Sequence, residues 1–229
     1  RNRPAPTAAE KAEMTAEELN QWNLDHISYY KLTADIYIND VNGKLWKDKV
    51  GCLDWFSQWV NGMYITNSHI NVDGDGHVVY GLYYYHPYGS EPYVRVGLFP
   101  VLCEYSTIQN LGMSNVHLEG VNVPNTDPKH VTDTMGAFVG CIEDYDKDYG
   151  FDSHDAEGNR EKVNDPIYQD LALKIKNCFV DHNSYISAYF TGGFIGAPYG
   201  APILENCLFT GSIGDHETDP YYTGALTGC

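Results

Sequence analysis

The sequence has few basic residues, no long apolar run and no closely paired cysteines. Its 229 residues include 14 Lys and Arg against 31 Asp and Glu, so the net charge is −17. Such a surface repels nucleic acid and anionic lipid, and it attracts cations instead. No stretch approaches the roughly 18 apolar residues of a membrane-spanning helix. We therefore expect no nucleic-acid partner and no membrane insertion.

Sequence patterns of common catalytic and metal sites are missing as well. None of the six cysteines forms a Cys-x-x-Cys pair, which argues against a zinc ribbon or a thioredoxin-type site. Neither a Gly-x-Ser-x-Gly nucleophile elbow nor a His-Glu-x-x-His zinc motif is present. We assign no catalytic residue, and whether the protein is an enzyme stays open.

What the sequence does contain is a repeat of short apolar units bounded by glycine. Four units align without gaps: "VGLFP" at 96–100, "GAFVG" at 136–140, "GGFIG" at 192–196 and "GALTG" at 224–228. A second unit, with Asn in one column, is interspersed: "IQNLGM" at 108–113, "IKNCFV" at 175–180 and "LENCLF" at 204–209. The two units alternate, so both belong to one repeat of about 30 residues.

A repeat of this length, with apolar runs of only a few residues, favours a coil of about three short strands. Helical repeats need amphipathic patterns of ten or more residues, which are absent, and propeller blades need roughly 40 residues. We therefore predict an all-β fold, a right-handed parallel β-helix (β-solenoid) whose stacked strands lie roughly 4.8 Å apart. Asn110, Asn177 and Asn206 are expected to point inward and to bond main-chain groups as a ladder.

Further stretches occur in a familiar order: "YKLTADIYIN" at 30–39, "VDGDGHVVYGLYY" at 72–84, "VGLFPVL" at 96–102 and "STIQNLGMSNVHLEG" at 106–120. Together with the repeats, they resemble the GLUG-repeat β-helix modules of bacterial and archaeal surface proteins. The resemblance covers most of residues 15–229 and implies the β-helix fold. The chain departs from the family pattern at Pro100, in place of Gly, and at the long polar insertion 141–170. Such modules occur in adhesins, peptidases and carbohydrate-active proteins alike.

The chain divides into a short N-terminal segment and one large domain. Residues 1–25 are predicted to form a linker and a short capping helix, which begins with the capping box "TAEE", Thr15 as N-cap and Glu18 at N3. A helix there would cover open strand edges. Residues 26–229 are predicted to form the β-helix with its insertion, and we expect the natural polypeptide to continue beyond the final "GALTGC".

The insertion contains the strongest candidate for a metal site. Its carboxylates follow the pattern D-x-D-x-D-x-G-x-D-x-x-D, which brings oxygen ligands together around a hard cation such as calcium. The candidate ligands are Asp144, Asp146, Asp148, Asp152 and Asp155. The match to an EF-hand loop is imperfect in its Gly and in its last ligand, and the alternative is a solvated acidic loop. The related stretch "NVDGDGHVV" is, by the resemblance, a structural turn that relies on Gly74 and Gly76.

Clustered aromatic residues suggest a surface for carbohydrate, since exposed flat rings are a common platform for sugars. The candidates are Trp55, Trp59, Tyr84, Tyr88 and Tyr93. The alternative is that Tyr83 and Tyr85, or else Tyr84, fill the interior of the β-helix. A separate prediction concerns Cys178 and Cys207, which share one column and are expected to stack as free thiols.

These observations favour a non-catalytic extracellular module of a microbial surface or secreted protein. It would present an adhesion or carbohydrate-recognition surface to a polysaccharide or to a host or cell-surface glycoprotein, and it would contact further modules of its own polypeptide. Calcium is the one cofactor suggested. The alternatives are a carbohydrate-active enzyme (a calcium-assisted polysaccharide lyase or a glycosidase) and an accessory domain of a secreted peptidase.

Overall fold

The computed structural model describes residues 13–15, 18, 28–54, 70–86, 94–103, 106–120, 133–143, 172–198, 202–214 and 222–228. Within these ranges the fold is all-β and every pairing of strands is parallel. A short helix, α3 (Lys44–Asp48), lies between two strands. No helix in the described part of the chain is long and apolar enough to cross a membrane.

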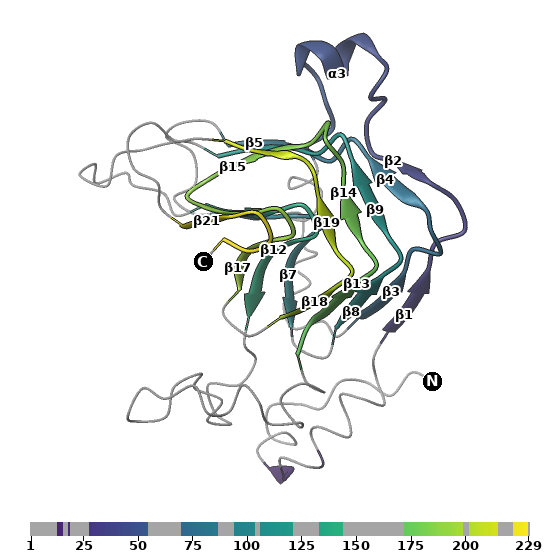
Figure 1. The fold of residues 1–229 in the computed structure, drawn as a ribbon, viewed down its shortest axis with the longest axis vertical. Helices are drawn as coiled ribbons and strands as arrows, with labels where there is room; N and C mark the ends of the chain where they lie inside the picture. Colours follow the sequence, from purple (N-terminus) through teal and green to yellow (C-terminus); the bar gives the residue numbers. More distant parts are fainter. Residues whose placement is uncertain are drawn as a thin grey trace, which may run out of the picture.

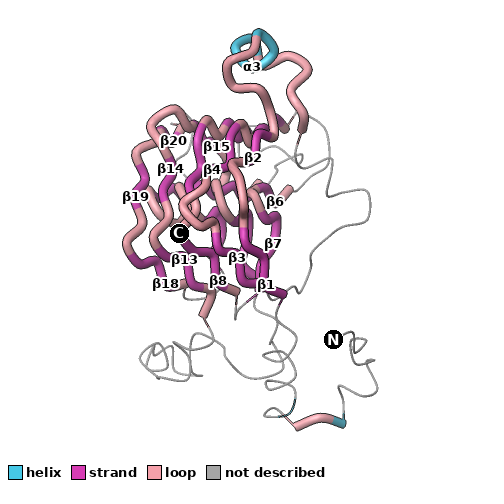
Figure 2. The backbone as a smooth tube through the Cα atoms, turned by 90° about the vertical axis from the view of Figure 1, so that its right-hand side faces the viewer, coloured by secondary structure: helices cyan, strands magenta, loops and turns pink. Residues whose placement is uncertain are grey.

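The strands gather in five sheets, which we name A to E (Figures 1 and 2). Sheet A contains β1 (Ser28–Lys31), β3 (Ile70–Asp73), β8 (Thr107–Gln109), β13 (Lys174–Lys176) and β18 (Ile203–Glu205). Sheet B contains β2 (Ile36–Tyr37), β4 (Val78–Tyr80), β9 (Gly112–Ser114), β14 (Phe179–Val180) and β19 (Leu208–Phe209). Sheet C contains β5 (Tyr83–Tyr85), β10 (His117–Glu119), β15 (Tyr185–Ser187) and β20 (Ser212–Ile213). Sheet D contains β6 (Arg95–Val96), β11 (Thr134–Gly136), β16 (Phe190–Gly192) and β21 (Tyr222–Gly224). Sheet E contains β7 (Phe99–Cys103), β12 (Val139–Glu143) and β17 (Ile195–Pro198).

From β3 onward the chain passes through sheets A, B, C, D and E in that order and then returns to sheet A. We call one such pass a coil. Residues at matching positions of successive coils pair directly, so that Val72, Ile108 and Ile175 follow one another in sheet A. All three are buried. The alternation of buried and partly exposed residues along these strands therefore places one apolar face of each sheet on a common core.

Aromatic stacking in the core follows the glycine-bounded repeat. The rings of Phe138 and Phe194 are parallel within 5° and their centroids are 5.2 Å apart. Both side chains are fully buried. Burial of a side chain of this size stabilises the fold by roughly 1.5–3 kcal/mol. Val139, which follows Phe138, pairs with Phe99, and Ile195, which follows Phe194, pairs with Thr227. Leu98 and Leu226 directly precede these partners, so they occupy the same column as the two phenylalanines.

The gapless alignment of the four repeat units is wrong in its first unit. It matches Val96 with Gly136, but in the structure Val96 pairs with Met135, while Phe99 pairs with Val139 as aligned. The connection from sheet D to sheet E is therefore one residue shorter in this coil than in the next coil. Gly97 makes the shorter corner possible, because a Cβ there would lie 2.7 Å from the carbonyl oxygen of Gly136.

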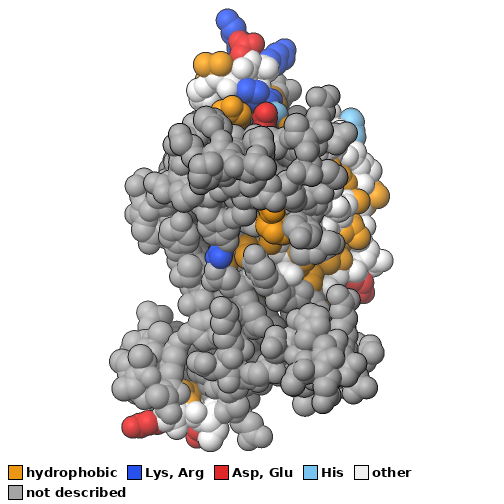
Figure 3. Space-filling view, turned by 90° about the vertical axis from the view of Figure 1, so that its left-hand side faces the viewer, with side chains coloured by type: hydrophobic (Ala, Val, Ile, Leu, Met, Phe, Trp, Pro, Cys, Tyr) orange, Lys and Arg blue, Asp and Glu red, His pale blue; other side chains and the backbone are white. Residues whose placement is uncertain are grey.

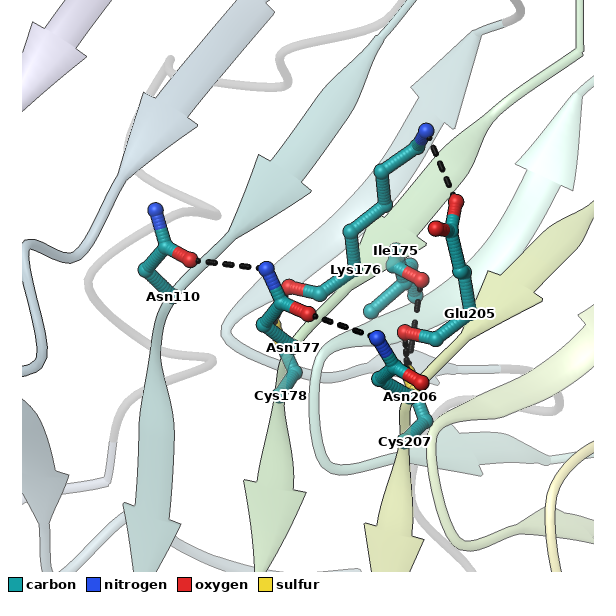
Figure 4. A network of polar contacts seen from close by, with 8 residues as sticks. All are labelled: Asn110, Ile175, Lys176, Asn177, Cys178, Glu205, Asn206 and Cys207. Carbon is teal, nitrogen blue, oxygen red and sulfur yellow. Dashed lines mark hydrogen bonds and ion pairs between the residues drawn. The ribbon is translucent and has the colours of Figure 1, made fainter.

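The predicted asparagine column forms a ladder, but on the outside of the coils (Figure 4). The side-chain amide of Asn177 donates to the side-chain oxygen of Asn110 at 3.0 Å, and that of Asn206 donates to Asn177 at 3.1 Å. The amide of Asn110 donates to Asp73 at 3.0 Å. All three asparagines have φ between 51° and 53°. This left-handed conformation turns their side chains outward at the corner, so they bond one another and not the main chain.

Both cysteines of the neighbouring column are free thiols, as predicted. Cys178 is buried and Cys207 is half-buried, and they follow the ladder asparagines in adjacent coils (Figure 4). The thiol of Cys178 donates to the carbonyl of Lys176 at 3.2 Å, and that of Cys207 donates to the carbonyl of Ile175 at 3.3 Å. Burial raises the pKa of the Cys178 thiol to about 12.

The capping box is present, and the strand before the insertion extends further than expected. Thr15 and Glu18 exchange the two hydrogen bonds of a capping box, at 2.8 and 3.2 Å, although most of the helix expected there lies outside the described residues. The insertion was expected to begin at residue 141, but Cys141 lies in β12, which continues to Glu143. This strand is longer than predicted because it pairs with β7 and β17 on its two sides.

The connection from sheet C to sheet D differs greatly in length between coils. Two residues separate Ser187 from Phe190, whereas fourteen separate Glu119 from Thr134. Nevertheless Glu119 pairs with Ser187 and Thr134 pairs with Phe190. The register of both sheets is therefore independent of the length of this corner.

Residues 38–54 leave the coils as an arm that carries α3, and Lys and Asp side chains gather on it at the top of Figure 3. The arm is fixed at two points. The side chain of Asn39 bonds both the N–H of Leu53 at 2.7 Å and the carbonyl of Gly81 at 2.7 Å. Trp46 is buried, and its ring meets Tyr83 of sheet C edge-on at 6.3 Å.

Candidate functional site

Most of the aromatic and acidic residues singled out from the sequence lie outside the described residues. These are Trp55, Trp59, Tyr88, Tyr93, Asp144, Asp146, Asp148, Asp152 and Asp155. Tyr84 is described, and it is only 5% exposed. Its ring belongs to the core under sheet C and offers no face to a sugar. Burial raises the pKa of the Tyr84 hydroxyl, and the nearby charge of Asp133 adds to this shift.

A different tyrosine is presented at the surface. Tyr29, on β1, is 75% exposed and stands at one edge of sheet A. It borders a groove of about 450 Å³ on the outer face of this sheet. The groove is lined by Tyr29, Tyr30, Lys31, Asn71, Val72, Asp73, Thr107 and Gln109. Apart from the tyrosines and Val72, its lining is made of amide, hydroxyl and charged side chains.

The pairing of strands arranges these side chains in two straight rows. Tyr29 pairs with Asn71, which pairs with Thr107, and these positions form the first row. The second row contains Lys31, Asp73 and Gln109 in the same order. Side chains two residues apart on a strand point to the same face, so both rows face outward while Val72 between them faces the core. The groove therefore crosses the strands and does not follow them.

Charges at one end of the groove are paired. Lys31 Nζ lies 2.9 Å from a carboxylate oxygen of Asp75. Asp73 accepts hydrogen bonds from the amide of Asn110 and from the N–H of Asp75, both at 3.0 Å. These bonds hold the pKa of the Asp73 carboxyl below its ordinary value, and the bond from Asn110 has the largest effect. The Asp73 side chain is thus an ionised acceptor near neutral pH.

This chemistry suits binding better than catalysis. A glycosidase needs one carboxylic acid that stays protonated and a second carboxylate across the bond that is cut. Among the described residues that line the groove, Asp73 is the one carboxylate, and its lowered pKa is the opposite of what a general acid requires. The side-chain oxygen of Asn71 is buried and has no hydrogen-bond partner among the described residues. Because it is closed to solvent, the acceptors that the groove offers a ligand are those of its other polar side chains.

A second polar group of interest lies in the corner between sheets C and D. His86 Nδ1 and Asp133 Oδ2 are 2.5 Å apart, and both side chains are almost fully buried. Asp133 also accepts a hydrogen bond from the N–H of Val94 at 3.3 Å. A histidine and carboxylate pair is a common catalytic element, but this one has no open face for a substrate. It joins two coils, since His86 follows β5 and Asp133 precedes β11.

The outer face of sheet C carries a row of stacked rings. His117 lies between Tyr83 and Tyr185, with centroid distances of 5.8 and 5.4 Å. Burial lowers the pKa of His117, against the opposing effect of its contact with Glu119 at 3.2 Å. The rings face one another and leave edges at the surface, so this row offers a sugar less contact area than Tyr29 does. Among the described residues, no cluster of three or more His, Cys, Asp or Glu could hold a metal ion.

The groove was missed at the level of sequence because its residues are far apart in the chain. Asn71 and Thr107 become neighbours of Tyr29 only through the register of three strands. One signal was available: the outer positions of "NVD", "TIQ" and "KIK" alternate with a buried Val or Ile and are all polar. In comparisons with known proteins, no family model, no curated protein and no solved structure matches this chain.

Proposed function

We propose that this chain is a non-catalytic carbohydrate-recognition module built as a right-handed parallel β-helix, with its binding site in the groove on sheet A. The observation that carries the proposal is the exposed ring of Tyr29 beside amide, hydroxyl and carboxylate side chains in the groove on the outer face of sheet A. An aromatic face with hydrogen-bonding groups beside it matches the apolar face and the hydroxyl groups of a sugar ring.

The proposed setting is the outside of a microbial cell, on a surface or secreted protein. Two features support it. The resemblance to GLUG-repeat modules is to surface proteins, and the acidic composition disfavours a nucleic-acid or lipid partner. A polysaccharide or a glycoprotein sugar is the proposed ligand.

Affinity electrophoresis tests this proposal. The protein is run through native gels that contain cellulose ether, xylan, glucomannan, galactomannan, starch, pectin or alginate. We expect at least one neutral polysaccharide to slow its migration. Tyr29→Ala should weaken this binding about tenfold, which corresponds to about 1.4 kcal/mol. Tyr85→Ala is the matched control, since Tyr85 is an exposed tyrosine on sheet C.

Unchanged migration in all seven gels would overturn the proposal. So would equal loss of binding in the Tyr29 and Tyr85 variants, because the ligand would then not lie on sheet A. Release of reducing sugars from a retained polysaccharide would contradict the non-catalytic assignment.

A further inference from the structure

We infer that the groove on sheet A binds a straight, neutral, β-1,4-linked polysaccharide whose chain crosses the strands from β1 toward β13. This inference rests on the proposed function and names the class and direction of its ligand. It comes from the geometry of the two rows and from the charge on them.

The rows continue in a straight line beyond the groove lining. Thr107 pairs with Lys174 and Gln109 pairs with Lys176, with no bulge between β8 and β13. Four strands at roughly 4.8 Å spacing extend the two rows over about 14 Å. In the other direction the strands are short: Tyr29 and Lys31 are two residues apart, which is only about 7 Å. A polymer that lies across the strands can therefore contact side chains of all four strands, whereas one that lies along a strand can contact only a few.

Outward side chains at matching positions of successive strands favour a straight polymer. Sugars joined through equatorial β-1,4 bonds form an extended ribbon, whereas α-1,4-linked glucose curves into a helix. The ribbon can meet one outward side chain of each row on each successive strand, from Tyr29 and Lys31 on β1 to Lys174 and Lys176 on β13. The curved chain would leave the sheet after one or two residues.

The net charge of the whole protein disfavours an acidic polymer, although the two rows contain Lys31, Lys174 and Lys176 beside Asp73. Lys31 is paired with Asp75 at 2.9 Å, and Lys176 is paired with Glu205 at 2.9 Å (Figure 4). Each of these lysines thus has a carboxylate partner of its own. An approaching uronate chain would also meet the field of a protein with net charge −17. A neutral chain meets neither obstacle.

The test compares oligosaccharides of two lengths by isothermal titration calorimetry. Cellobiose and cellohexaose, and xylobiose and xylohexaose, are titrated into the intact chain, with maltohexaose as the helical counterpart. One hexasaccharide should bind at least about tenfold tighter than its dimer, because it also reaches β8 and β13. Maltohexaose should bind more weakly than that hexasaccharide.

Two variants locate the contacts. The double variant Thr107→Ala with Gln109→Ala should reduce the preference for the hexamer to about threefold or less and leave dimer binding unchanged. Tyr29→Ala should weaken both lengths. Ser212→Ala, an exposed position on β20, is the control and should change neither.

The outcomes separate the two proposals. Equal affinity for dimer and hexamer, or tighter binding of maltohexaose, overturns the straight-polymer inference and leaves carbohydrate recognition standing. Retention by pectin or alginate alone in the electrophoresis overturns the neutral class. Failure of all these oligosaccharides together with all seven polysaccharides removes the proposed function itself.

Discussion

Asn177 both donates and accepts a side-chain hydrogen bond, to Asn110 at 3.0 Å and from Asn206 at 3.1 Å. It does so with φ at 52°, a conformation that most residues avoid. The same residue thus makes the corner and ties three coils together on their outer surface.

Replacing Asn177 separates these two roles. Asn177→Ala loses both ladder bonds and keeps the unfavourable φ, so we expect a loss of about 2–3 kcal/mol in the free energy of unfolding. Asn177→Gly loses the same bonds but adopts this φ readily, so its loss should be smaller by about 1 kcal/mol. Chemical denaturation followed by circular dichroism measures both. Equal stability of the two variants would show that φ does not matter here.

Substitutions at Phe194 test whether side-chain volume or ring stacking stabilises this column of the core. Phe194→Ala should cost about 3–5 kcal/mol, because it removes a fully buried ring that stacks on Phe138. Phe194→Leu should cost less than about 1.5 kcal/mol, because leucine already occupies this column at Leu98 and Leu226. Thermal and denaturant melts of the two variants provide the measurement. A similar loss in both would mean that ring stacking, and not volume, dominates.

The carboxyl group of Asp181 is expected to make the free energy of unfolding depend on pH. Burial alone would raise the pKa of Asp181, but hydrogen bonds from Ser114, Asn115, Asn183 and Ser184 outweigh it, so the pKa lies below its ordinary value. The stabilisation is therefore present above the unfolded pKa, about 3.9, and is lost as the pH falls through the folded value.

We expect Asp181→Asn to be less stable than the natural chain at pH 7, and the difference to shrink toward pH 3. Denaturation midpoints across this range test it. Asp48→Asn, at an exposed position on the arm, is the control for the change of charge alone. A difference for Asp181→Asn that stays constant with pH would rule out the carboxylate as the cause.

The two thiols should differ in reactivity. With a pKa raised by burial to about 12, Cys178 is almost entirely protonated at pH 8. It should resist iodoacetamide in the native state, while the half-buried Cys207 reacts faster. Both should label fully in guanidinium without reductant, as read by peptide mass spectrometry. A peptide that links Cys178 to Cys207 would contradict the free-thiol state.

Calcium binding is a prediction from the sequence alone, for residues 144–155. Millimolar calcium should raise the melting temperature, with a gain of about 2.7 kcal/mol at a hundredfold excess over Kd. Asp146→Ala together with Asp148→Ala should remove that gain and leave the far-ultraviolet spectrum unchanged. An unchanged melt and no calorimetric heat would mean that the stretch is a solvated acidic loop.

The sequence predicted those features that repeat and missed those that depend on one coil. Phe138 and Phe194 stand in the same column because like residues stack, which a periodic pattern reveals. Val96 was misplaced by one residue, since an apolar residue beside glycine looks alike in either register. The outward direction of Asn177 was missed because composition does not disclose the sign of φ. Tyr29 was missed because two adjacent tyrosines in a strand do not show which ring faces outward until their partner strands are known.

The corner between sheets C and D is a position at which a foreign peptide could be inserted and displayed. It spans two residues after Ser187 and fourteen after Glu119 while the strands on either side keep their partners. A foreign peptide epitope grafted between Ala188 and Tyr189 would remove the two hydrogen bonds between the Ala188 backbone and Thr191 Oγ1 that close the short corner, but we expect the strand pairs on either side to keep their partners. A corner whose length can change in this way also separates the design of the exposed loop from the design of the core beneath it.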